Sequence, residues 1–70
     1  MTYGEVLDYL IEQSGMTRSE VARKAGMGRS QITDLISGRT KEPSLSRAKA
    51  IADALGVKIE DFITLMEKDC

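Results

Sequence analysis

The residues of this sequence that could do chemistry are its arginines and lysines, which gather in the middle of the chain. Between residues 16 and 50, eight basic residues stand against three acidic ones, a local charge of +5. The flanks are acidic, so the net charge of the whole chain is only −1. A basic middle of this kind can dock one face of a protein on an anionic polymer, or it can be ordinary solvated charge. The basic residues are Arg18, Arg23, Lys24, Arg29, Arg39, Lys41, Arg47 and Lys49.

The sequence shows no combination of side chains that is typical of an enzyme active site. The chain has no histidine, and its one cysteine, Cys70, has no base to activate it. We therefore expect no enzyme, no metal, no cofactor and no small-molecule ligand. A lone cysteine favours a reducing compartment, and no apolar run is long enough for a membrane span or a signal peptide. A cytoplasmic protein without a membrane partner is the expectation.

The elements that would position the basic residues are helices. Apolar residues recur at helical spacing and nowhere alternate as they do in a strand. A chain of 70 residues is near the lower size limit of a domain, so we expect one domain over residues 1–70. The pattern predicts an all-α fold of five short helices, with stripes in residues 6–11, 18–25, 29–36, 45–55 and 59–66.

The sharpest helix start is a capping box at residues 17–20. The Thr17 hydroxyl can accept from the backbone N–H of Glu20, whose side chain reaches back. That helix ends early at Gly26, which can take a positive φ, and the small Ala22 lets the next helix approach closely. Two helices joined by so tight a turn have the geometry of a helix-turn-helix, whose second member can enter a DNA major groove.

Residues 17–43 resemble the helix-turn-helix of the phage repressor and Cro family of bacterial transcription regulators. The resemblance implies a five-helix, lambda-repressor-like DNA-binding domain with the helix-turn-helix in its second and third helices. The tail at residues 50–57, with Ile59 and Phe62, is similar to the closing segment of that family. The residues that carry the match in the motif itself are residues 17–22, Gly26, Ile32, Leu35, Ser37-Gly38 and Pro43.

The resemblance implies that the third helix reads bases with its outward face. Arg29 is the strongest candidate, because a guanidinium can bond guanine O6 and N7 together. Asp34 departs from a simple basic face, since its carboxylate would repel phosphates unless it accepts from a cytosine amino group or orients a donor. The base-reading candidates are Arg29, Ser30, Thr33, Asp34 and Ser37.

Phosphate contacts are implied at both ends of the motif. We expect the other basic residues of the middle segment, Arg23, Lys24, Arg47 and Lys49, to contribute long-range field or solubility only. The first helix is acidic on its polar side, at Glu5, Asp8 and Glu12, which fits a helix that faces away from DNA. The phosphate candidates are Arg18, Gly28, Arg39, Thr40 and Lys41.

A single module offers one short helix to DNA, so related regulators bind as dimers on paired half-sites. Ile59, Leu65 and Met66 are the candidate residues of a homodimer surface, because the last helix has apolar residues left over. Leu65 packing on the first helix is the alternative, and we assign Phe62 and Ile63 to the core.

These features together predict a sequence-specific regulator of double-stranded DNA, acting as a repressor, from a phage, a mobile element or a bacterium. The alternative is a protein-interaction module, or an antitoxin-like partner protein, that keeps the helix-turn-helix fold. The net charge of −1 and Asp34 favour the alternative, whereas the basic middle and Arg29 oppose it.

Overall fold

The computed structural model describes residues 1–40 and 42–67. All regular structure within these ranges is helical, as predicted: α1 (Tyr3–Ser14), α2 (Arg18–Ala25), α3 (Arg29–Ser37), α4 (Leu45–Leu55) and α5 (Ile59–Glu67). None of these helices is both long enough and apolar enough to cross a membrane.

The helix starts follow from local side-chain chemistry. The capping box predicted for α2 is present, with Thr17 Oγ1 accepting from the Glu20 amide at 3.1 Å and Glu20 Oε1 accepting from the Thr17 amide at 3.1 Å. A second capping box, between Thr2 and Glu5, starts α1 in the same way. Each box satisfies two of the backbone donors that a helix leaves open at its first turn.

The turn between α2 and α3 is made at Gly26, whose φ of 72° lies in the left-handed region. The amide of Met27 then donates to the carbonyl oxygen of Ala22 at 2.8 Å, which closes the end of α2. This turn confirms the role that the sequence predicts for Gly26, and it lets α3 pack directly against α2.

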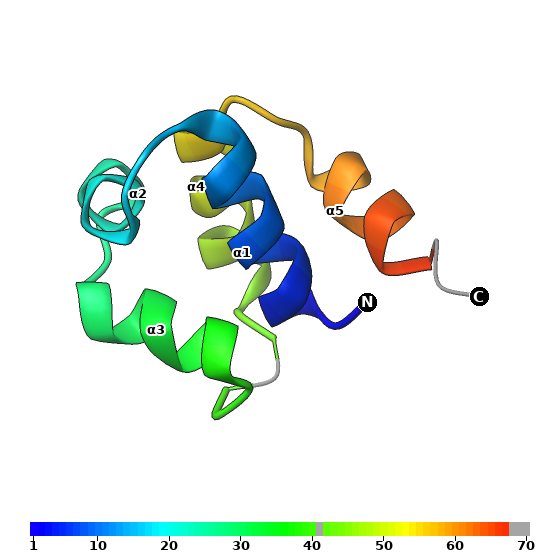
Figure 1. Ribbon diagram of the computed structural model, residues 1–70, viewed down its shortest axis with the longest axis horizontal. Coiled ribbons are helices and arrows are strands. Elements are labelled where there is room, and N and C mark those ends of the chain that lie inside the picture. Colours follow the sequence, from blue (N-terminus) through cyan, green and yellow to red (C-terminus); the bar gives the residue numbers. More distant parts are fainter. Residues whose placement is uncertain (41, 68–70) are drawn as a thin grey trace.

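The core lies around α1, which packs against α3, α4 and α5 (Figure 1). The helix-turn-helix forms one side of the molecule, with α2 resting on α4 and α3 on α1, while α5 covers the opposite side. The most deeply buried large side chains are Val6, Leu7, Val21, Ile32 and Ile51, of which α1 contributes two and α2, α3 and α4 one each. Burial of this apolar surface supplies the main driving force for folding.

Two apolar residues lie outside the core that the helical stripes predict. Leu45 is 76% exposed in the first turn of α4, and Ile63, which we assigned to the core, is 49% exposed on α5. Phe62 is buried, as expected, and stacks on Tyr3 of α1 with ring centroids 4.9 Å apart. The helical spacing of apolar residues predicts α5 correctly, but the small core has room for only part of the apolar surface of this helix.

The backbones of α1 and α3 approach each other closely at Gly4. A Cβ atom at Gly4 would overlap the carbonyl oxygen of Leu35 and come within 2.9 Å of the carbonyl oxygen of Ile36. Only a glycine therefore lets the backbones of α1 and α3 approach this closely.

We expect Gly4→Ser to lower the free energy of unfolding by about 2 kcal/mol, because α1 must move away from α3 to accommodate the new side chain. Gly28→Ser is the matched control, since a Cβ there meets only Ser30 Oγ at 3.8 Å and serine is favoured at a helix N-cap. Urea unfolding of both variants measures the difference. Equal stability of the two variants would contradict the close approach.

The hydroxyl of Tyr3 is buried with no hydrogen-bond partner among the described residues. Burial, and secondarily the carboxylate of Glu42, raise the pKa of Tyr3 from 10.0 to about 12. Because the phenol of the unfolded chain ionises first, the stability that Tyr3 contributes is complete below pH 10 and is lost as the pH rises toward 12.

We expect Tyr3→Phe to keep the aromatic stack and to remove this alkaline loss. Urea unfolding of the natural chain and of Tyr3→Phe across this pH window tests the expectation. The free energy of unfolding should fall more steeply with pH in the natural chain. A Tyr9→Phe variant, in which Tyr3 is the remaining tyrosine, should show phenol ionisation near pH 12 by absorbance. Parallel stability curves for the natural chain and Tyr3→Phe would refute the assignment.

Candidate nucleic-acid interface

The outward side of α3 carries all five residues predicted to read bases. Arg29, Ser30 and Ser37 are exposed, and Thr33 and Asp34 are half-buried. The opposite side of α3 is anchored by Ile32 and Leu35 in the core. The five side chains predicted to read bases therefore lie on the side of α3 that is not buried in the core.

The start of α3 is held by Gln31, which the sequence analysis did not include in the site. Gln31 Oε1 accepts from the Gly28 amide at 3.0 Å. This bond orients the first turn, where Arg29 and Ser30 project. The amide N–H of Gly28, a residue predicted to contact a phosphate, therefore already has a hydrogen-bond partner within the chain.

The end of α3 is tied to its own backbone at Asp34. The Ser37 hydroxyl and the Thr40 amide both donate to the carbonyl oxygen of Asp34, each at 3.2 Å. Ser37 therefore uses its proton within the helix and offers lone pairs to a ligand. Thr40 has only its hydroxyl left for the phosphate contact that we predicted.

Arg47 joins the site, although we had expected only long-range field from it. A hollow of about 240 Å³ lies between α3, the segment that follows it and the first turn of α4, and Arg47 and Asp34 both line it. The signal in the sequence was the position of Arg47 in the first turn of a helix that begins just after Pro43. The remaining lining residues are Met27, Gln31, Leu35, Thr40 and Pro43.

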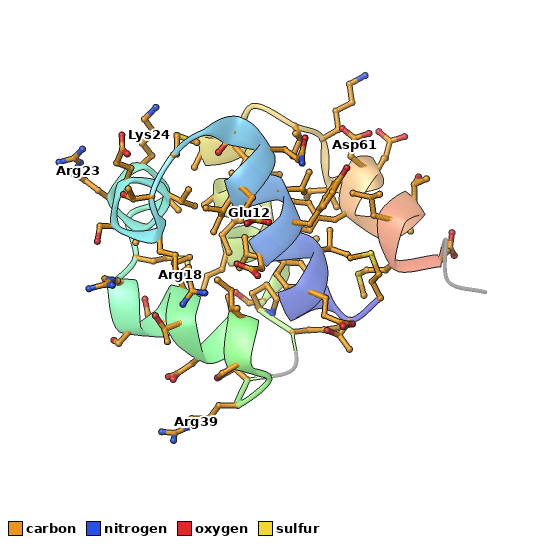
Figure 2. All side chains as sticks on the ribbon, in the orientation of Figure 1. Glu12, Arg18, Arg23, Lys24, Arg39 and Asp61 are labelled. Carbon is orange, nitrogen blue, oxygen red and sulfur yellow. The ribbon has the colours of Figure 1, made fainter. Side chains whose placement is uncertain are left out.

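Arg18 lies at the first position of α2 and turns toward α1 and α3, whereas Arg23 and Lys24 extend from the other side of α2 (Figure 2). Its guanidinium Nη2 lies 3.5 Å from Oδ1 of Asp8 on α1, and the two side chains are 40% and 48% exposed. Asp8, on the acidic side of α1 that we expect to face away from DNA, therefore lies beside a residue predicted to contact phosphate. Such an exposed pair adds only about 0–1 kcal/mol to stability.

The basic residues that follow α3 extend the site at its other end. Arg39 is exposed and projects outward beyond the end of α3 (Figure 2). Lys41, also predicted to contact phosphate, lies outside the described residues. Arg39 thus projects beyond the end of α3, whereas Arg18 lies on the side of α2 that faces α1 and α3.

The residues predicted for a dimer surface lie on α5, away from this site. Ile59, Leu65 and Met66 are half-buried and pack partly against the core. Ile63 is the most exposed large apolar residue of α5. The apolar side chain of α5 that the core leaves most exposed is therefore Ile63 and not Leu65.

Comparisons with known proteins place this geometry in a family. The helix-turn-helix family model matches residues 7–62. Over 63 residues, 90% of this chain, the sequence is 32% identical to the immunity repressor protein of Bacillus phage phi105, and it spans 43% of the length of that repressor. The fold superposes with a TM-score of 0.84 on the crystal structure of the clp gene regulator ClgR from C. glutamicum, at 23% identity, covering 96% of this chain and 88% of that one. The chain belongs to the helix-turn-helix family of the phage repressor and Cro type.

Proposed function

We propose that this chain binds double-stranded DNA in a sequence-specific manner and acts in the cytoplasm as a transcriptional repressor. The observation that carries the proposal is the outward face of α3, where Arg29 is exposed in the first turn of a helix whose other side is buried in the core. The similarity to an immunity repressor supports repression as the outcome.

In the proposed complex α3 lies in the major groove. Arg29 donates two hydrogen bonds to guanine O6 and N7, and Ser30 and Thr33 contact neighbouring base edges. Asp34 accepts from a cytosine amino group, with Arg47 in the same hollow to offset its charge against the phosphates. Arg18 and Arg39 contact the phosphates that flank the groove and set the register of α3.

We further propose that the protein acts as a homodimer through α5. A dimer places two copies of α3 on half-sites about one helical turn apart, which gives a site long enough for specificity. Ile63 is exposed on α5, with the half-buried Ile59 and Met66 one turn away on the same side of the helix, and offers the apolar contact.

The base-reading role of Arg29 is tested by binding to the intergenic DNA upstream of the gene and to unrelated DNA of equal length, at two salt concentrations. We expect Arg29→Ala to weaken binding to the upstream DNA about tenfold or more, because a bidentate arginine–guanine contact contributes about 1–3 kcal/mol of discrimination. Binding to unrelated DNA should change much less.

Arg23→Ala is the matched control, since it removes the same charge from the far side of α2 and should leave the preference intact. An equal loss of affinity for both DNAs would show that Arg29 contacts phosphate and does not read a base. If the natural protein bound neither DNA at either salt concentration, an interaction module or antitoxin-like partner protein would replace the proposed regulator.

The dimer proposal is tested by sedimentation of Ile63→Glu and Thr64→Glu. Both residues are exposed on α5 and both variants add the same charge. We expect Ile63→Glu to weaken self-association at least tenfold, because it buries a charge in an apolar contact, and Thr64→Glu to have a smaller effect. A natural protein that sediments as a monomer at high concentration would refute the dimer.

A further inference from the structure

The carboxylate of Asp8 lies beside the guanidinium of Arg18, the cation on α2 that is proposed to contact phosphate. Asp8 comes from the middle of α1, and its Oδ1 contacts Arg18 Nη2 at 3.5 Å. Both side chains remain accessible to solvent, so a second anion can reach the same guanidinium. The pair therefore joins an acid of α1 to a cation of the proposed DNA interface.

The pair has little to do with holding α1 in place. α1 is already anchored by Val6 and Leu7 in the core and by the close approach of Gly4 to α3. One contact between two exposed side chains adds little to that packing. The consequence of the pair is instead electrostatic, because the negative charge of Asp8 weakens the positive field of Arg18.

We propose that Asp8 competes with DNA phosphate for Arg18 and thereby lowers the affinity of the protein for DNA of any sequence. The inference rests on the proposed function, because it assigns to Asp8 a role in tuning the affinity of the same DNA-binding site. Carboxylate and phosphate are alternative partners of one guanidinium fork. An arginine already neutralised by a carboxylate gains less from a phosphate, and the carboxylate it leaves behind repels that phosphate.

The effect falls on phosphate contacts and leaves base reading alone. Asp8 and Arg18 lie on α1 and α2, whereas the base-reading side chains project from α3. Affinity for the correct site and for unrelated DNA should therefore fall by the same factor. Recognition then depends more heavily on the contacts of Arg29 and its neighbours, and the protein spends less time on DNA without its site.

The test is Asp8→Asn, which removes the charge and keeps the shape of the side chain. We expect binding to upstream and unrelated DNA to tighten by a similar factor, about 3- to 10-fold at low salt. The slope of log K against log salt should steepen by up to about 0.9, the contribution of one added phosphate contact. Asp8→Glu, which keeps the charge, should bind like the natural protein.

Two controls separate this mechanism from a general change of charge. Glu60→Gln alters the net charge equally on α5, which packs on α1 and α4 on the opposite side from α3, and should change the affinity less than about twofold (Figure 1). In an Arg18→Ala background the gain from Asp8→Asn should disappear, because no guanidinium is left to release.

An unchanged or weaker affinity of Asp8→Asn, when the natural protein binds, would overturn this inference and leave the proposed function standing. The same gain in the Arg18→Ala background would also overturn it, since Asp8 would then act by direct repulsion of DNA. If neither the natural protein nor Asp8→Asn bound DNA, both proposals would fall.

Discussion

The left-handed turn at Gly26 is the constraint on which the rest of the site depends. It reverses the chain within a few residues, so that α3 packs on α2 instead of continuing away from it. Once α3 is turned back, Ile32 and Leu35 enter the core and the opposite side of the same helix is left to solvent. The glycine at position 4 then lets α1 close on the far end of α3. Two positions without a Cβ thus determine the direction in which Arg29 projects.

The electrostatics of the interface are more balanced than a basic middle segment suggests. Arg18 is paired with Asp8, and Arg47 lines the same hollow as the carboxylate of Asp34. A protein with a net charge of −1 cannot rely on a broad positive field to hold DNA. Its proposed specificity therefore depends on directional contacts from α3, with phosphate contacts of reduced strength at the flanks.

Most of the fold could be predicted because its determinants are local. The capping box at Thr17, the glycine at position 26 and the apolar stripe through Ile32 each act over a few residues, where the spacing of side chains is set by the helix itself. Leu45 and Ile63 could not be placed in this way. Their exposure depends on how much apolar surface the core has room for, which is a property of the whole domain.

The sequence by itself determined the five helices, the turn of the helix-turn-helix and the set of side chains on the outward face of α3, because each follows from residues adjacent along the chain. Only the tertiary structure decided which charges meet. Asp8 reaches Arg18 because α1 lies beside the start of α2, and Arg47 reaches the hollow of Asp34 because α4 begins beside α3. The Asp8–Arg18 pair and the hollow that Asp34 and Arg47 line each involve two separate helices, and a pattern within one helix carries no information about its neighbour across the fold.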